Sequence, residues 1–401
     1  MAGPTLADIV DPNWHPETKD DWDSLEYYTT QLFRPAAPIV EDGFFAGRFA
    51  QARALLDVIY QPGGHAILYG ERGVGKTSLV NIINERIIAP AKYTHVLKVG
   101  CNVTDTFATI WSNVFFNYTW KERTVADIIR ENPQPFTVYK IAESLDQRTL
   151  VIIDEFDRVG DALTKTLIAD TIKYLSDNPA TRFTVVVVGV GKSIAELFGS
   201  HPSIQRCCEQ IQMPRMSAVE LQQIADTRWT QLRMHALPEV VERMTKFAQG
   251  LPGYMHLLGQ LATLAAINGR SQLIDLSHLK TAVENALERA DESTRTAYYR
   301  AIQSTKPDNR YREVLLACAL AKKNEIGQFS ASAVCEPYSE IRGAAMGIEH
   351  FARHLDTFCD PARGPVLVKF GKRRGFMYQF ANPLLEPLVV MIGQHGPTGA
   401  V

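Results

Sequence analysis

The sequence predicts an α/β protein built on a doubly wound parallel sheet, followed by a helical lid and a winged helix-turn-helix domain. Three observations predict this class. Short runs rich in Val and Ile alternate with helical segments between residues 41 and 215, and residues 216–290 have a helical pattern throughout. Near the C-terminus, several helical segments precede two apolar strands joined by a glycine-bounded turn. Strand–helix alternation places a ligand site at the carboxyl ends of the parallel strands.

The elements follow in four segments, which we expect to be an extension at 1–40, a core at 41–215, a lid at 216–290 and a last domain at 291–401. The extension is acidic and carries Trp14 and Trp22, so we expect it to dock on this chain or on another. Core strands are predicted at 65–69, 94–99, 149–153 and 183–188, after a helix at 49–60. Later helices are predicted at 238–249, 254–268, 276–289, 310–322, 329–335 and 344–357, and later strands at 366–370 and 376–380.

Composition limits the possible functions. The 401 residues carry a net charge of −2, so no whole-chain field attracts nucleic acid or an anionic membrane. The six cysteines have no metal-ligand spacing, which indicates reduced thiols. Neither a signal peptide nor an apolar run long enough to span a bilayer is visible. We therefore expect a cytoplasmic protein without a membrane partner.

The run from Gly70 to Thr77 carries the strongest motif in the chain. Its residues, Gly70, Glu71, Arg72, Gly73, Val74, Gly75, Lys76 and Thr77, match the phosphate-binding P-loop, and Ser78 follows. An apolar strand leads in and an amphipathic helix leads out, as the motif requires. Glycines let backbone N–H groups turn toward a phosphate, and the helix N-terminus adds partial positive charge. Lys76 can then reach the β- and γ-phosphates, and the Thr77 hydroxyl can bind Mg²⁺.

A second motif, at residues 149–155, complements the first. An apolar strand ends in Asp154 and Glu155, which is the Walker B pattern. Asp154 can hold Mg²⁺, since this ion prefers one or two carboxylates plus phosphate oxygens. Glu155 can orient and deprotonate the attacking water. Asp157 and Arg158 are interpreted as a surface salt bridge without a catalytic role.

In this order, the P-loop, the Walker B strand, the helical lid and the winged helix resemble AAA+ ATPases of the origin-recognition initiator type. The resemblance covers about residues 41–392 and is most specific in the core. It implies binding of ATP and Mg²⁺ and hydrolysis of ATP. Residues 44–48, which end in Arg48, are similar to the family's adenine-binding box.

The resemblance also implies less certain positions. Ser193, beside Lys192, stands where relatives place a polar sensor of the γ-phosphate, and Arg206 stands where they place an arginine finger for a neighbouring subunit. Arg215 is a weaker candidate for the finger. The lid lacks the family's second sensor arginine. Its Gly250-Leu251-Pro252 instead resembles the G-x-P element of STAND signalling ATPases, whose proline packs near the nucleotide; slow hydrolysis is therefore expected.

The last domain carries the question of the partner. Lys369, Lys372, Arg373 and Arg374 cluster on the predicted wing, so the domain can contact double-stranded DNA; a solvated hairpin tip is the alternative.

Three functions remain open: an ATPase switch that engages DNA, a STAND-like regulator of a defence or signalling system that acts with a separate effector protein, and a nucleotide-binding scaffold without turnover. A homo-oligomer or a partner effector protein is expected.

Overall fold

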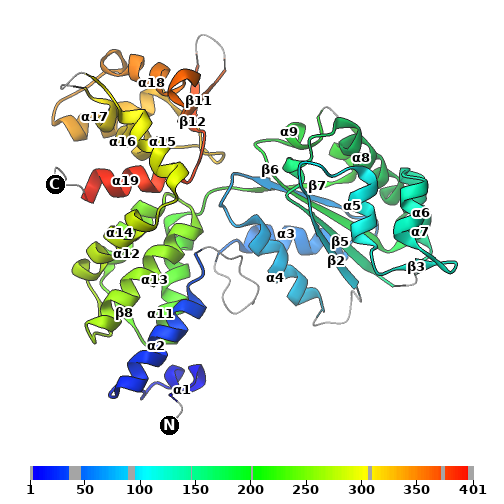
Figure 1. Cartoon of the computed structure of the whole chain (residues 1–401), viewed down its shortest axis with the longest axis horizontal. Helices are drawn as coiled ribbons and strands as arrows, with labels where there is room; N and C mark the ends of the chain where they lie inside the picture. Colours follow the sequence, from blue (N-terminus) through cyan, green and yellow to red (C-terminus); the bar gives the residue numbers. More distant parts are fainter. Residues whose placement is uncertain are drawn as a thin grey trace. The chain divides into compact units, whose positions relative to one another are not determined.

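The computed structural model of the chain describes residues 3–35, 47–88, 95–145, 147–199, 202–305, 309–371 and 375–395 (Figure 1). The chain forms two compact units. One consists of residues 38–214, and the other combines residues 1–37 with residues 215–401. The second unit is therefore built from both ends of the sequence. Within the described residues, no helix combines the length and the apolar character that a bilayer-spanning segment needs.

The centre of the first unit is a five-stranded sheet in the order β2-β5-β6-β1-β7, with every neighbouring pair parallel. The strands are β1 (Ala66–Gly70), β2 (His95–Gly100), β5 (Thr149–Asp154), β6 (Phe183–Val190) and β7 (Glu209–Met213). The doubly wound sheet and its first four strands are thus confirmed. Strand β7 was not predicted, because Glu209, Gln210 and Gln212 interrupt its apolar pattern; it is an edge strand that buries only Ile211 and Met213.

Helices cover both faces of the sheet. Figure 1 shows α3 and α4 on one side and α5 to α8 on the other. The helices of this unit are α3 (Phe49–Tyr60), α4 (Lys76–Ile88), α5 (Phe107–Val114), α6 (Val125–Glu131), α7 (Pro135–Glu143), α8 (Ala162–Ser176), α9 (Ile194–Phe198) and α10 (Pro202–Cys207), with short turns η2 (Phe156–Arg158) and η3 (Pro179–Thr181) and a hairpin of β3 (Thr119–Trp120) and β4 (Arg123–Thr124).

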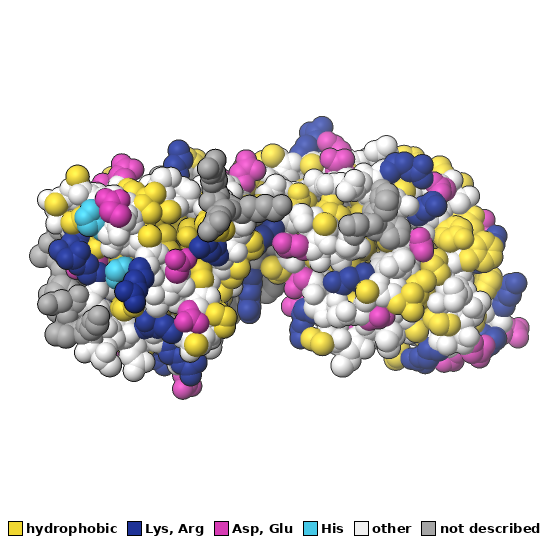
Figure 2. Space-filling model, turned by 90° about the horizontal axis from the view of Figure 1, so that it is seen from above, with side chains coloured by type: hydrophobic (Ala, Val, Ile, Leu, Met, Phe, Trp, Pro, Cys, Tyr) yellow, Lys and Arg dark blue, Asp and Glu magenta, His cyan; other side chains and the backbone are white. Residues whose placement is uncertain are grey.

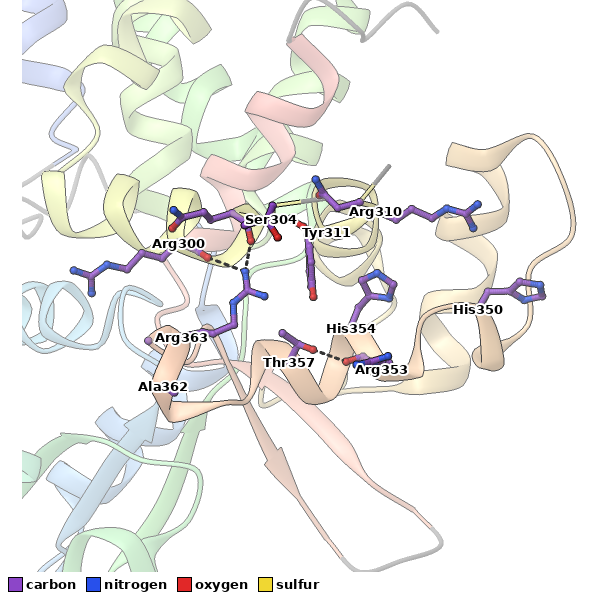
Figure 3. Close-up of a pocket in the computed structure, with 14 residues that line it drawn as sticks. Arg300, Ser304, Arg310, Tyr311, His350, Arg353, His354, Thr357, Ala362 and Arg363 are labelled. Carbon is purple, nitrogen blue, oxygen red and sulfur yellow. Dashed lines mark hydrogen bonds between the residues drawn. The ribbon is translucent and has the colours of Figure 1, made fainter. Parts of the chain in front are cut away.

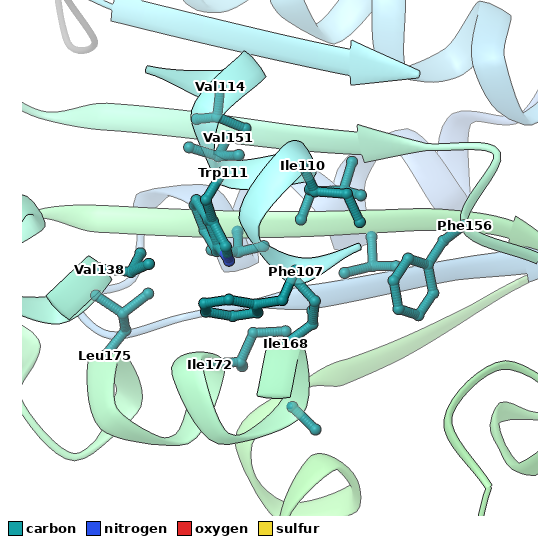
Figure 4. Close-up of a cluster of buried hydrophobic side chains, with 14 of the residues drawn as sticks. Phe107, Ile110, Trp111, Val114, Val138, Val151, Phe156, Ile168, Ile172 and Leu175 are labelled. Carbon is teal, nitrogen blue, oxygen red and sulfur yellow. The ribbon is translucent and has the colours of Figure 1, made fainter. Parts of the chain in front are cut away.

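The core beneath α5 and α8 holds the sheet rigid. Trp111 is fully buried there, with its ring 5.9 Å from that of Phe115, and Figure 4 shows it beside Phe107 and Ile172. Alternate residues of β5, Val151 and Ile153, join this cluster. The residues between them are buried as well, which is the pattern of a central strand with both faces covered. This packing fixes the strand ends on which the site is built.

The second unit begins with a bundle that includes the N-terminal segment. Its elements are α1 (Leu6–Val10), α2 (Lys19–Leu32), α11 (Ala218–Leu232), α12 (Pro238–Ala248), α13 (Pro252–Asn268) and α14 (Leu276–Arg289), with β8 (His235–Ala236) pairing in parallel with β9 (Leu273–Ile274). The predicted docking surface of the extension is therefore on this chain. Phe33 is fully buried, and a Cβ at Gly259 of α13 would overlap its ring. The Arg228 Nε donates to the Leu32 carbonyl at 3.1 Å, and the Gln260 amide donates to the Phe33 carbonyl at 2.9 Å.

The rest of this unit has the element order of a winged helix. It comprises α15 (Glu292–Ile302), α16 (Tyr311–Leu320), β10 (Phe329–Ser330), α17 (Ala331–Arg342), η4 (Ile348–His350), α18 (Ala352–Phe358), η5 (Pro361–Arg363), β11 (Leu367–Phe370), β12 (Met377–Phe380) and α19 (Leu385–His395). The strands form a three-stranded sheet in the order β10-β12-β11.

Two helix boundaries in this domain differ from the prediction. The helix expected at 329–335 continues to Arg342, because Pro337 is accommodated inside it. A proline removes only the hydrogen bond of its own nitrogen, and the surrounding packing of this buried ring offsets that loss. The helix expected at 344–357 begins only at Ala352, since Gly343 ends α17 in the left-handed conformation and a 3₁₀ turn intervenes.

Candidate nucleotide-binding site

The predicted phosphate loop lies at the carboxyl end of β1, in the middle of the sheet. Residues 71–75 connect the strand to α4, which begins at Lys76. Gly73 and Gly75 have φ values of 85° and 97°, which residues with a Cβ rarely adopt. Strand β1 lies between β6 and β7, where the order of the strands reverses. Open α/β sheets bind their ligands in such a position.

The Lys76 side chain lies under this loop. Its ammonium group donates to the carbonyls of Gly70 at 3.0 Å and Glu71 at 2.7 Å. Burial lowers the pKa of Lys76 to about 8, although the charges of Asp157, Asp154 and Glu71 act in the opposite direction. A phosphate chain bound in the loop would supply the negative charge that favours the protonated ammonium.

Asp154 ends β5 beside the start of α4, as the Walker B pattern predicts. Its Oδ1 lies 3.4 Å from the Thr77 Oγ1 and accepts a hydrogen bond from the Glu155 backbone N–H at 2.9 Å. Its Oδ2 forms an ion pair with the Lys98 ammonium of β2 at 3.1 Å. The structure thus brings together one hydroxyl and one carboxylate at the edge of the phosphate loop. This donor set fits Mg²⁺, which keeps several ligands from water and phosphate.

Glu155 turns away from the strand in an unusual backbone conformation. Its φ is 56°, in the left-handed region that costs a non-glycine residue about 1–2 kcal/mol. Such strain at a strand end next to a phosphate loop is typical of functional sites. The carboxylate is half exposed and pairs with Arg158 at 2.9 Å. The structure therefore places the predicted base at the open edge of the site.

Two charged groups at this edge were not predicted as site residues. Lys98 was overlooked, although a lysine within an apolar strand was a usable signal. Asp157 does not pair with Arg158; its Oδ1 accepts from the Val190 backbone N–H at 2.7 Å, and this bond fixes the end of β6. The adjoining Gly191 N–H donates to the Gly70 carbonyl at 3.3 Å. Asp157 therefore links the Walker B turn to the strand end beside the phosphate loop.

The family comparison agrees with this geometry. Residues 59–198 match the family model described as an AAA domain, and this range contains the loop, Asp154, Glu155 and the end of β6. This part of the chain is an AAA domain. The resemblance to AAA+ P-loop ATPases is thereby confirmed, and nucleotide binding follows for the AAA domain at the level of the family. No curated protein sequence matches the chain.

Solved structures extend the likeness beyond the AAA domain. The Walker-type ATPase of Pyrococcus abyssi is 14% identical, with a TM-score of 0.51, over 89% of this chain and 99% of that protein. The ORC2 protein of Aeropyrum pernix, solved in ADPNP–ADP complexes, is 14% identical, with a TM-score of 0.50, over 90% and 97%. The ORC1 protein of the same organism, solved with DNA, is 16% identical, with a TM-score of 0.48, over 91% and 96%. At these identities the first two show a shared fold.

Arg48 reaches the phosphate loop of the AAA domain from the N-terminus of α3. The side chain is buried, with 2% exposed, and its φ is 59°. Its guanidinium donates to the Val74 carbonyl at 3.2 Å and to the Pro214 carbonyl. Arg48 therefore supports the loop from behind. Residues 44–46 of the predicted adenine box lie outside the described residues.

The remaining predicted positions of the AAA domain stay predictions. Ser193 is exposed at the N-terminus of α9, and burial lowers the pKa of the neighbouring Lys192, with Glu196 and Glu71 opposing. Arg206 lies on α10 with its side chain 70% exposed, 3.4 Å from the Asp177 carboxylate. The role of Arg206 toward a neighbouring subunit stays a prediction.

Pro252 belongs to the other unit, where it begins α13. Gln249 and Gly250 before it have φ values of 50° and 80° and end α12. A Cβ on Gly250 would lie 2.7 Å from the Arg215 Cβ. The Gly-Leu-Pro run therefore has a structural role, because it breaks one helix, begins the next and gives Arg215 its place.

Arg215 is the centre of a buried ion cluster in this unit. Its guanidinium donates to both oxygens of Glu386 on α19, at 2.8 and 2.7 Å. Lys323, after α16, donates to the same carboxylate at 3.1 Å, and Glu386 is completely buried. Tyr254 adds a hydrogen bond to the Leu384 carbonyl at 2.8 Å. These contacts fasten the lid helices to the C-terminal domain.

On the predicted wing, only Lys369 lies within the described residues, since Lys372, Arg373 and Arg374 fall outside them. Its ammonium pairs with Asp356 of α18 at 2.8 Å and lies 4.0 Å from the Phe376 ring centre. The hydrogen bond to Asp356 raises the pKa of Lys369. Lys369 is therefore held against α18, and its role in DNA contact stays a prediction.

Proposed function

We propose that the chain is an ATP-hydrolysing molecular switch that couples its nucleotide state to the lid and winged helix and engages DNA. The observation that supports this most is the convergence of the glycine loop, Lys76, Thr77 and Asp154 at one edge of the sheet, with Thr77 and Asp154 oxygens 3.4 Å apart. The A. pernix ORC2 protein, which shares the fold, was solved with ADPNP and ADP. Adenine nucleotide is accordingly the proposed ligand.

In this proposal each residue has a defined role. The loop amides and Lys76 bind the phosphates, and the ammonium exchanges its carbonyl partners for phosphate oxygens. Thr77 and Asp154 hold Mg²⁺, which neutralises charge on the phosphates when bound. Glu155 takes a proton from the attacking water, and ATP and water yield ADP and phosphate. Arg206 completes the site of a neighbouring copy in an assembly.

DNA engagement rests on the C-terminal domain. Its element order is that of a winged helix, which can place its third helix in the major groove and its wing along the backbone. The four basic wing residues would then contact phosphates. Replacing Lys369, Lys372, Arg373 and Arg374 by Ala should weaken binding of a duplex and flatten its salt dependence. No duplex binding by the wild-type chain at low salt would exclude this part of the proposal.

One observation favours the STAND-like regulator as a second candidate. The Arg215–Glu386–Lys323 cluster holds the winged helix against the lid with groups that are almost fully buried. A domain fastened in this way suits an internal latch that nucleotide exchange releases toward a separate effector protein.

The nucleotide part is tested by equilibrium dialysis with ATP and Mg²⁺. Lys76→Ala should abolish the Mg²⁺-dependent ATP retention of the phosphate loop, because the buried cation is lost. Arg53→Ala is the matched control, since Arg53 is 79% exposed and pairs only with Asp57 on its own helix. Retention of ATP by Lys76→Ala at the wild-type level would refute the site.

A further inference from the structure

A basic cleft lies among the described residues of the C-terminal domain. This cleft of about 1010 Å³ opens between residues 300–305 and 309–311 on one side and residues of η4, α18 and η5 on the other (Figure 3). Arginines, histidines and neutral hydrogen-bonding groups form its walls. Its lining residues include Arg300, Arg310, Tyr311, Arg353, His354 and Arg363.

The cleft has a strongly unbalanced charge. Its described lining includes four arginines and two histidines and no Asp or Glu. The guanidinium groups of Arg300, Arg310 and Arg353 make no hydrogen bond or ion pair with any described residue. By contrast, Arg342 of the same domain pairs with Glu313 at 3.1 Å. Seen from above, the surface of this domain carries histidines beside Lys and Arg side chains (Figure 2).

The walls of the cleft are held in place by their own contacts. Arg363 donates hydrogen bonds to the backbone carbonyls of Arg300 at 3.4 Å, of Ala301 at 3.5 Å and of Gln303. These bonds hold η5 against the end of α15. Its guanidinium lies 4.7 Å from the Tyr311 ring centre, and the His354 ring lies 5.0 Å from Tyr311 on another side. Arg363 and Tyr311 therefore form a fixed partition between the two ends of the cleft.

Cationic groups lie on both sides of Tyr311, and both histidines lie on the same side as Arg310 and Arg353. Figure 3 shows Arg310, Arg353, His354 and His350 on one side of Tyr311, with Arg300 and Arg363 on the other. The pKa of His354 is lowered, first by burial and then by the positive charges of Arg310 and Arg353. Both guanidiniums thus act on the same imidazole. A bound anion on this side of the cleft would be attracted by both charges.

We propose that this cleft is a second phosphate-binding site, separate from the P-loop, which takes a compact di- or triphosphate group. Guanidinium forks suit phosphate oxygens, and the hydroxyls of Ser304, Thr357 and Tyr311 supply further polar contacts around them. The volume is of the size that small ligands occupy. The groups come from two facing walls of one cleft. A duplex backbone, by contrast, presents its charges in a row, about 3.4 Å apart along each strand.

The test uses the full chain carrying Lys76→Ala, so that the P-loop does not contribute and failure of the proposed ATPase function leaves the result unaffected. The probe is inorganic tripolyphosphate, followed by isothermal titration calorimetry. One binding site per chain is expected. Adding Arg310→Gln and Arg353→Gln should weaken binding more than about tenfold, because each change removes charge-assisted hydrogen bonds to phosphate. Arg342→Gln is the matched control and should leave the affinity unchanged.

Further ligands separate the possible sources of the anion. If the Lys76→Ala chain binds ATP and loses this binding with the two arginines, a nucleotide is supported as the occupant. If it binds tripolyphosphate but not ATP, inorganic polyphosphate is supported. Citrate of similar charge should bind more weakly. The proposal is overturned if tripolyphosphate does not bind, if its binding survives loss of both arginines, if citrate binds equally well, or if only a DNA duplex competes for these residues.

Discussion

The role of Glu155 can be separated from its ion pair with Arg158. In the structure the Glu155 carboxylate is bound to Arg158 at 2.9 Å, so it is either the partner in a surface ion pair or the base that activates water. Two single changes distinguish these roles. Glu155→Gln removes the base and the pair together, whereas Arg158→Gln removes only the pair.

The exposure of the two side chains sets the expected magnitudes. Arg158 and Glu155 are 50% and 55% exposed, and such pairs contribute about 0.2–1 kcal/mol. Releasing the carboxylate should therefore change the rate by less than about fivefold. Loss of a positioned general base should lower the rate by about 10²–10⁴-fold.

The assay measures phosphate release at saturating ATP and Mg²⁺, with ATP retention measured in parallel by equilibrium dialysis. Glu155→Gln should retain ATP and release almost no phosphate, while Arg158→Gln should hydrolyse at close to the wild-type rate. An equal loss in both variants would refute the reasoning, because the carboxylate would then act through its ion pair. A wild-type rate for Glu155→Gln would refute the assignment of the base.

Two further predictions concern stability. Arg215→Met should lower the free energy of unfolding by about 3 kcal/mol in urea titrations, because Glu386 is fully buried; Arg206→Met, which breaks an exposed pair, should cost less than about 1 kcal/mol, and equal losses would contradict the burial argument. His65 is buried and its Nδ1 accepts from the Val185 N–H, with burial lowering its pKa from 6.5 to about 4. The unfolded chain therefore binds a proton that the folded chain excludes, so stability falls as the pH drops through this window. Between pH 7 and pH 5 the wild type should lose about 2 kcal/mol more than His65→Asn, which keeps an acceptor; equal losses in urea titrations at the two pH values would contradict the assignment.

Local sequence patterns made the candidate nucleotide-binding site predictable. The glycines before Lys76 shape the phosphate loop through their own φ values, without distant contacts. Asp154 stands at the end of an apolar strand, so short runs of sequence determine both halves of the site. The four central strands were predicted for the same reason, since both of their faces are buried. Strand β7 was missed because an edge strand needs only two inward side chains.

Contacts between distant residues were not predictable. Arg215 and Glu386 are separated by 171 residues, and nothing near either of them indicates that they pair. Lys98 meets Asp154 only because β2 and β5 are neighbours in the sheet. The same applies to the basic cleft, whose arginines come from segments that lack any motif. The sequence indicated a basic wing, whereas the structure brings Arg300, Arg310 and Arg353 together in one cleft.

The docking of the first 35 residues has a consequence for how the protein is made. Phe33 and Leu32 find their partners on α11 and α13, and the bond from Gln260 to Phe33 spans 227 positions. At about 5–20 residues per second, a ribosome needs roughly 10 to 45 s to synthesise that distance. During this interval Phe33 has been synthesised but its partners on α11 and α13 have not, while residues 38–214 of the first unit are being made. The second unit can therefore be completed only after α11 and α13 have been synthesised, when residues 32 and 33 can pack against them.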